Sequence, residues 1–108
     1  MATSYKVLGQ QAPAVSTWVD LYTVPAGAQT VCSTLSVCAR TVTAGIRVAV
    51  RPAGAALANE HYLIYDNWVD GGDTVFLTLG ITLDATDVLS VYSDQATVSY
   101  SLFGSEIT

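Results

Sequence analysis

The segment Ile46-Arg47-Val48-Ala49-Val50-Arg51 decides the fold class of this chain. Its aliphatic side chains fall on one face of an extended backbone and its arginines on the other, because successive side chains of a strand point to opposite faces. The segment Thr97-Val98-Ser99-Tyr100-Ser101-Leu102 repeats this pattern with hydroxyl groups in place of charges. A period of two indicates half-buried strands of an antiparallel sheet.

Turn residues divide the 108 residues into about eight short strands. We therefore predict one domain, residues 1–108, folded as an all-β antiparallel β-sandwich of the jelly-roll or immunoglobulin-like type. Residues 10–16 are expected to cross between the sheets, and residues 52–60 to form either one helical turn or an extended crossover. The last two strands are expected to pair as a hairpin. The expected strands are 4–9, 18–24, 29–41, 46–51, 61–66, 74–80 with a short 81–83 segment, 88–93 and 97–103.

The inward positions of these strands provide the predicted core. Truncation of a buried aliphatic side chain there should be costly, because a cavity remains. The predicted core residues are Val31, Leu35, Val37, Ile46, Val48, Val50, Val75, Leu77, Leu79 and Leu102.

The chain carries little charge: 12% of its residues are charged, about half of the roughly 25% in an ordinary soluble domain. Contacts between subunits are depleted of charge, so this composition favours an oligomer. The net charge of −5 leaves no cluster of cations for a phosphate backbone, and nucleic acid is not an expected partner. No signal-peptide pattern and no long apolar run is present, which predicts synthesis in a cytoplasm and no membrane partner.

Cys32 and Cys38 lie six residues apart on one expected strand. Their α-carbons would then be roughly 20 Å apart, beyond the 4.4–6.8 Å span of a disulfide. We expect two free thiols; pairing between subunits is the alternative.

Sites for catalysis or for metal ions have weak support in the sequence. His61 is the only histidine, so it is the only possible base of a catalytic triad, and no nucleophile motif accompanies it. Asp66, Asp70 and Asp73 surround a Gly-Gly turn and could supply calcium ligands, but aspartate is also an ordinary turn residue. Asp84 and Asp87 are likewise interpreted as turn residues, whose side-chain oxygens accept hydrogen bonds from turn amides. We expect no enzymatic activity, no metal and no cofactor.

Large aromatic residues and arginines are the stronger candidates for a functional surface. Aromatic side chains near loops can stack on sugar rings, anchor a protein interface or pack in the core. Outward-facing arginines can pair with carboxylates of a neighbouring subunit or remain solvated. The candidate interface residues are Trp18, Arg47, Arg51, Tyr62, Tyr65 and Trp68.

Three segments together resemble a family of small virion structural proteins of tailed bacteriophages, which is common among phages of cyanobacteria and other aquatic bacteria. They are Leu21-Tyr22-Thr23-Val24-Pro25-Ala26-Gly27, the run from Ile46 to Gly54 followed by Asn59-Glu60-His61-Tyr62, and the ending Ser99-Tyr100-Ser101-Leu102-Phe103-Gly104-Ser105-Glu106-Ile107-Thr108. The resemblance covers nearly the whole chain and includes no catalytic motif. Trp18 and Trp68 stand where smaller residues are expected in that family.

The resemblance implies a non-enzymatic β-sandwich protein located in the virion, as an accessory part of the tail, neck or capsid. Its expected partners are further copies of itself, in a trimer, and neighbouring virion proteins. The alternative is a lectin-like module that recognises host glycan through Trp18, Trp68 or the tyrosines. A glycan site needs exposed aromatic rings flanked by polar groups, whereas an interface buries its aromatic rings against another chain.

Overall fold

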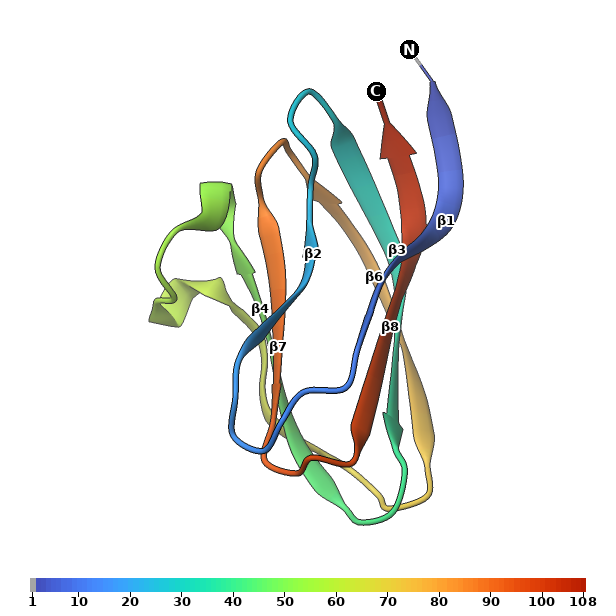
Figure 1. Cartoon of the computed structure of the whole chain (residues 1–108), viewed down its shortest axis with the longest axis vertical. Coiled ribbons are helices and arrows are strands. Elements are labelled where there is room, and N and C mark those ends of the chain that lie inside the picture. The colour runs from blue at the N-terminus through green and yellow to red at the C-terminus, as the bar shows by residue number, and fades with distance from the viewer. Residues whose placement is uncertain (1) are drawn as a thin grey trace.

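The computed structural model describes residues 2–108 and shows two four-stranded antiparallel sheets packed face to face (Figure 1). The predicted all-β sandwich of about eight strands is confirmed. Sheet A has the strand order β1-β8-β3-β6, and sheet B the order β2-β7-β4-β5. The strands are β1 (Thr3–Gln11), β2 (Val19–Thr23), β3 (Gln29–Ala39), β4 (Ala44–Arg51), β5 (Tyr62–Val69), β6 (Thr74–Leu83), β7 (Val88–Ser93) and β8 (Val98–Ile107).

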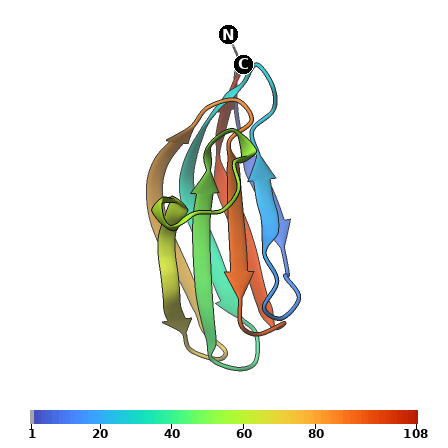
Figure 2. The same ribbon diagram turned by 90° about the vertical axis from the view of Figure 1, so that its left-hand side faces the viewer.

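The pairing is nested: β1 pairs with β8, β2 with β7, β3 with β6 and β4 with β5. Such an order results from winding one long antiparallel ribbon around a common core, which is the jelly-roll arrangement. Strands that follow each other in sequence therefore lie mostly in opposite sheets. Figure 2, which shows sheet B from its outer side, has β2, β7, β4 and β5 in front.

The predicted hairpin of the last two strands is wrong. β7 belongs to sheet B and β8 to sheet A, so the turn between them crosses from one sheet to the other. A crossing between the sheets near Pro13 is present, as predicted, but it spans residues 12–18 rather than 10–16, because Gln10 and Gln11 still pair with β8. The turn residues between β7 and β8 are compatible both with a hairpin and with a crossing to the other sheet. Only the long-range pairing of β8 with β1 and β3 shows that the chain crosses.

Several strands are longer than predicted. The 74–80 and 81–83 segments form one strand, β6, which continues through Gly80 at a φ of +59°. β5 extends to Val69 and β8 to Ile107, and Ala44 and Gly45 belong to β4 rather than to the preceding turn. The 52–60 region contains two short 3-10 turns, Pro52–Gly54 and Asn59–His61.

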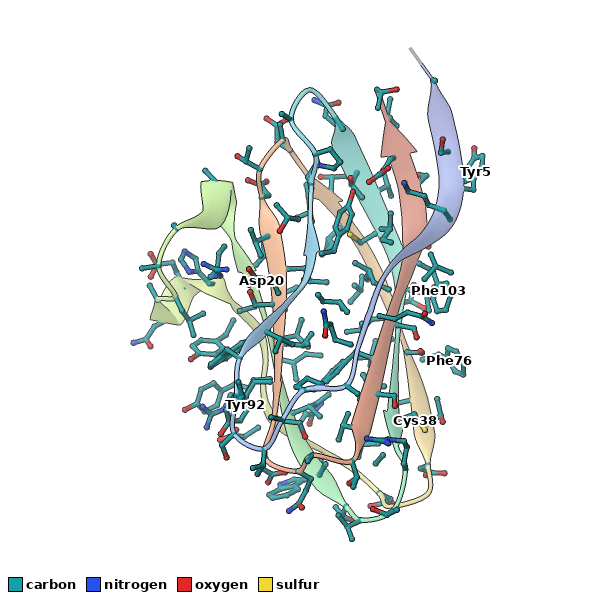
Figure 3. All side chains as sticks on the ribbon, in the orientation of Figure 1. Tyr5, Asp20, Cys38, Phe76, Tyr92 and Phe103 are labelled. Carbon is teal, nitrogen blue, oxygen red and sulfur yellow. The ribbon has the colours of Figure 1, made fainter. Side chains whose placement is uncertain are left out.

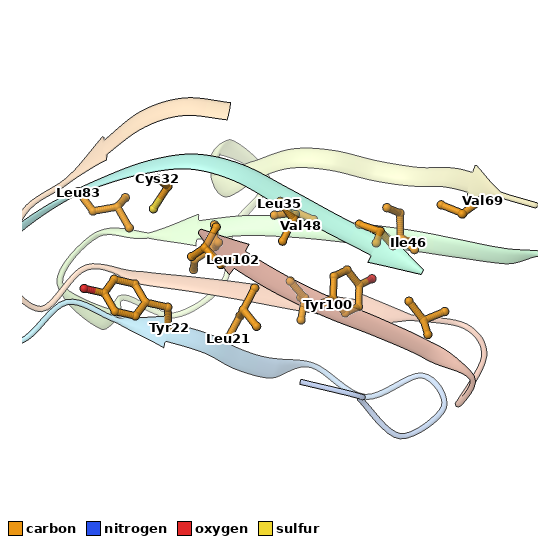
Figure 4. Packing of buried hydrophobic residues seen from close by; sticks show 14 of the residues in the cluster. Leu21, Tyr22, Cys32, Leu35, Ile46, Val48, Val69, Leu83, Tyr100 and Leu102 are labelled. Carbon is orange, nitrogen blue, oxygen red and sulfur yellow. The ribbon is translucent and has the colours of Figure 1, made fainter. Parts of the chain in front are cut away.

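The core lies between the sheets, and ten of its side chains are labelled in Figure 4. Five predicted core residues are fully buried, and Val50, Val75, Leu77 and Leu79 are partly buried against them. The sequence prediction omitted further buried members, among them Leu21, Tyr22, Leu89, Val91 and Tyr100. The confirmed, fully buried residues are Leu35, Val37, Ile46, Val48 and Leu102.

Val31 is the one predicted core residue that the structure places elsewhere. A β-bulge between Cys32 and Thr34 reverses the alternation of β3, because it inserts one residue into the ladder. The inward residues are Thr30 and Cys32 before the bulge, and Leu35 and Val37 after it. Val31 therefore lies on the outer side of sheet A, beside Ser105 and Thr82.

Because of the same bulge, the side chains of Cys32 and Cys38 point to opposite sides of sheet A. Cys32 is buried and Cys38 is half-buried, and both thiols are free, as predicted. Burial raises the pKa of the Cys32 thiol to about 11. Among residues 2–108, no helix is long and apolar enough to cross a membrane.

Candidate functional site

The structure brings all six candidate interface residues together on the outer face of sheet B. The side chain of Tyr92, which the sequence prediction did not select, completes the cluster; it projects from the outer side of sheet B in Figure 3. Tyr92 lies opposite Arg47 in the β4–β7 ladder, so its alternation with the inward Val91 was the signal that could have identified it. We call this surface the aromatic face: Trp18, Arg47, Arg51, Tyr62, Tyr65, Trp68 and Tyr92.

An irregularity in β5 directs the neighbouring side chains of Tyr65 and Asp66 to this face, where both contact Arg47. Asp66 has a φ of +54°, and the register with β4 shifts between the Ile46–Asn67 pair and the Val48–Ile64 pair. A bulge of this kind re-aims side chains, and bulges are common beside binding sites. Tyr65, Asp66 and Trp68 are all exposed as a result, while Val69 returns to the core.

Arg47 is held at the centre of the face. Its Nε donates to Asp66 Oδ1 at 2.6 Å, and its Nη2 donates to Asp66 Oδ2 at 3.2 Å. The guanidinium carbon lies 4.3 Å from the ring centre of Tyr65 and 4.8 Å from that of Tyr92. This two-point hydrogen bond raises the pKa of Arg47 and lowers the pKa of Asp66. The group is a planar, fixed donor–acceptor pair.

The aromatic rings form a continuous series along the face. Trp18 lies 5.4 Å from Tyr92 and 5.9 Å from Tyr62, measured between ring centres. Tyr62 meets Tyr65 edge-on at 4.8 Å. Rings at these separations stabilise each other, so each ring is held in place by its neighbours on the face.

Two hollows flank this series. The Trp68 hollow, about 180 Å³, is lined by Gly45, Arg47, Asp66, Trp68, Tyr92 and Asp94. The Trp18 hollow, about 320 Å³, is lined by Trp18, Asp20, Arg51, Leu57 and Ser90. Concave surfaces with aromatic walls and a few fixed polar groups are the usual form of small-ligand sites.

Arg51 is fixed in the same way as Arg47. Its Nη2 donates to Asp20 Oδ1 at 2.7 Å, and its Nε donates to the Ser90 hydroxyl at 3.1 Å. Its Nη1 reaches the carbonyl oxygens of Gly54 and Ala55 in the 3-10 region. Both arginines thus find carboxylate partners within their own chain, and neither needs a carboxylate from a neighbouring subunit.

The other candidate residues have structural partners. The Nδ1 of His61 accepts a hydrogen bond from the Ala58 amide at 3.1 Å, which closes the second 3-10 turn. The carboxylates of Asp84 and Asp87 accept amide hydrogen bonds within their own turn, whereas the Gly-Gly turn is closed by a backbone hydrogen bond from the Asp73 amide to the Asp70 carbonyl oxygen at 3.0 Å. The Asp66 carboxylate is hydrogen-bonded to Arg47, so it is not directed toward a shared calcium site with Asp70 and Asp73. Within residues 2–108, no three His, Cys, Asp or Glu side chains gather as metal ligands would.

The sequence prediction did not identify a second surface, the outer face of sheet A. Tyr5, Phe76 and Phe103 point away from the sandwich on this side in Figure 3. Tyr5 is 85% exposed and Phe76 67%. We call this surface the charge-free face: Tyr5, Val7, Val31, Phe76 and Phe103, together with the serine and threonine residues between them.

The charge-free face has a simple physical basis. The four strands of sheet A contain only two charged residues, Lys6 and Glu106, which pair with each other. Lys6 alternates with Tyr5 and Val7 and so belongs to the opposite side of β1. A hollow of about 620 Å³ lies between Tyr5, Val31 and Phe103, and Lys6, whose ammonium group is paired with Glu106, is also among its lining residues.

Comparison of the chain with protein-family models, with curated proteins and with solved structures gave no match.

Proposed function

We propose that this protein is a non-enzymatic structural component that assembles as a homo-oligomer through its charge-free face. Following the resemblance of its sequence, we place it in the virion of a tailed bacteriophage, on the tail, neck or capsid, in contact with neighbouring virion proteins. The observation that carries the proposal is that the outward side chains of all four strands of sheet A are uncharged in a chain with net charge −5, while the one cation beside them, Lys6, is paired with Glu106.

An exposed surface of this kind is unfavourable for an isolated protein. Exposed apolar patches of a few hundred Å² on a monomer mark sites of interaction. The interior of a protein interface is likewise poor in charged residues and rich in aromatic ones. Tyr5, Phe76 and Val7, which is 48% exposed, have the composition of such an interior.

A second copy of the chain is the occupant that fits this face best. An uncharged surface gains nothing from a charged partner, whereas two identical uncharged surfaces match each other. Tyr5 projects next to the hollow between Val31 and Phe103, so a contact with another copy would place the tyrosine ring of one copy in the hollow of its neighbour.

The size of the face agrees with a stable contact. Seen face-on, the molecule extends 43 Å along its strands and 19 Å across them (Figure 2). The rectangle that encloses this view is roughly 800 Å², so the face reaches at most about the share of each partner in a standard-sized interface. We expect three copies per assembly, because threefold environments are common in the virions that the resemblance suggests; the charge-free face would then supply one of the contacts between copies.

The test is the oligomeric state of matched variants. Val7 and Val42 are almost equally exposed, at 48% and 47%, but Val42 lies in the turn between β3 and β4, outside the charge-free face. Sedimentation equilibrium should show an oligomer for the wild type and for Val42→Glu, and a monomer for Val7→Glu and Phe76→Glu. A wild-type monomer at all concentrations, or an oligomer unaffected by both glutamates, would refute assembly through this face.

The virion location has its own test. A density map of an intact particle from a phage that encodes this chain should contain the jelly roll in contact with other virion proteins. Its absence from the particle would refute the location and leave the sedimentation result unaffected.

A further inference from the structure

We propose that the aromatic face binds an uncharged oligosaccharide that extends from the Trp68 hollow to the Trp18 hollow. This site lies on sheet B, opposite the proposed assembly face, and neither proposal depends on the other. It would give the assembled protein a second activity, the recognition of a glycan surface.

The Trp68 hollow has an aromatic wall and a glycine floor. Trp68 is 66% exposed although its side chain is large and apolar. A Cβ atom at Gly45 would lie 3.4 Å from the Trp68 ring and 3.1 Å from Asp94 Oδ2, so any other residue would narrow the hollow. The absence of a side chain at Gly45 therefore keeps a space open between an indole ring and a carboxylate.

The chemistry of these walls matches a pyranose ring. The face of an aromatic ring carries partial negative charge, and it attracts the weakly positive C–H groups on the apolar face of a sugar. Hydroxyl groups at the sugar edge need both donors and acceptors. Arg47 supplies fixed N–H donors, and Asp66 and Asp94 supply carboxylate acceptors, all on the lining of one hollow.

These polar groups are already in place. Arg47 is bound by Asp66 and stacked between two tyrosine rings, and Asp94 Oδ1 accepts the Gly45 amide at 2.8 Å. A sugar that binds here loses its own freedom but need not order the side chains of the site, and such preorganisation favours binding.

The charges of the hollow select against acidic sugars. Asp66 neutralises Arg47, and within residues 2–108 Asp94 has no ion-pair partner. The lining therefore carries one net negative charge, which repels a uronate or sialate carboxylate at close range. Uncharged sugars avoid this cost.

The spacing of the two hollows favours a chain over a single sugar. Gly45 and Arg51, which line the two hollows, are six residues apart on β4 and hence about 20 Å apart. The Trp18–Tyr92 contact joins the hollows, since each ring lines one of them. An extended chain of several sugar units spans this distance with aromatic contacts along its length.

The experiment is a binding titration with neutral oligosaccharides of increasing length: gluco-, manno-, xylo- and galacto-oligosaccharides, with oligogalacturonides as the acidic comparison. Trp18 and Trp68 are the only tryptophans, so their fluorescence reports binding at either hollow. We expect saturable binding of at least one neutral series and of no acidic one, with affinity that rises with chain length.

Variants locate the site. Trp68→Ala and Gly45→Ala should each weaken binding of the best neutral oligosaccharide tenfold or more by calorimetry, with folding verified by urea denaturation. Val42→Ala is the control, because Val42 is 47% exposed but lies in the turn between β3 and β4, outside both the charge-free face and the lining of the two hollows; its affinity should equal that of the wild type.

Three outcomes of the binding experiments would refute the proposal. They are no binding of any neutral series at millimolar concentration, preferential binding of the acidic sugars, and binding that both Trp68→Ala and Gly45→Ala leave unchanged. A protein partner that occupies the aromatic face in a particle map would also refute it, because the rings would then be buried against another chain.

Discussion

Tyr22 on β2 donates a hydrogen bond to the carboxylate of Glu106 on β8, so that a phenol of sheet B and an acid of sheet A are joined across the interior of the sandwich. Thr30 shares the Tyr22 hydroxyl at 2.7 Å, and Lys6 pairs with the other carboxylate oxygen. Burial raises the pKa of Tyr22, so the phenol remains protonated and able to donate. This small network is one polar link between the two sheets; another is the hydrogen bond that the Tyr100 hydroxyl on β8 donates to the Tyr92 carbonyl oxygen on β7 at 2.7 Å.

Acid should weaken this link. The Lys6 ammonium group, and after it the Tyr22 hydroxyl, lower the pKa of Glu106 below its ordinary value of 4.5. The stabilisation is therefore complete above pH 4.5 and is lost as pH falls through the lower pKa of the folded state. We expect the free energy of unfolding, measured in urea from pH 7 to pH 2.5, to fall less steeply for Glu106→Gln than for the wild type over the acid range. Parallel curves would contradict the role of Glu106.

Truncation of leucine side chains should distinguish the core from the surface. Leu35 and Leu102 face each other across the β3–β8 ladder and are fully buried, whereas Leu63 is 47% exposed. Leu35→Ala and Leu102→Ala should each cost about 2–5 kcal/mol because a cavity remains. Leu63→Ala should cost about 0.5 kcal/mol or less, as a surface substitution does. Urea denaturation measures all three, and similar costs would refute the assigned core.

A methyl group at Gly9 should disrupt the contact between the sheets at their β1–β2 edge. A Cβ at this position would lie 2.1 Å from the Leu21 carbonyl oxygen, a backbone atom that cannot move independently. We expect Gly9→Ala to destabilise the fold by at least the 1–3 kcal/mol typical of overpacking. The control is Gly27→Ala, which meets no atom within 4 Å and costs only the strain of its φ of +78°. Thermal unfolding of both variants provides the comparison.

The two thiols should react at different rates. Cys32 is fully buried with its pKa raised to about 11, and little reactive thiolate is present at neutral pH. Cys38 is half-buried on the outer side of sheet A. Iodoacetamide under native conditions should modify Cys38 first, and mass spectrometry should find no Cys32–Cys38 link. Equal labelling rates, or such a link, would contradict the orientation of β3.

The agreement between sequence and structure is best where local alternation decides the outcome. The pattern of Ile46, Val48 and Val50 against Arg47 and Arg51 predicted both the strand and its two faces, because side-chain direction in a strand depends only on position. The six candidate interface residues were chosen as large aromatic or outward cationic side chains, and the structure places them on one face. Their function stays a prediction.

The sequence by itself determined which segments are strands, which side chains of a regular strand are apolar, and that turns separate them. Only the tertiary structure decided which strands pair, and to which side of the sheet the side chains beyond a bulge point. Val31 faces outward and Asp66 meets Arg47 because bulges shift the alternation by one residue, and a bulge depends on the neighbouring strands. The β7–β8 crossing follows from pairings between residues far apart in sequence, Thr3 with Ile107 and Gln29 with Ile107. Local residue patterns do not predict these pairings, because the two partners are far apart in the sequence. The favourable free energy of such contacts arises only when the two sheets pack on a common core.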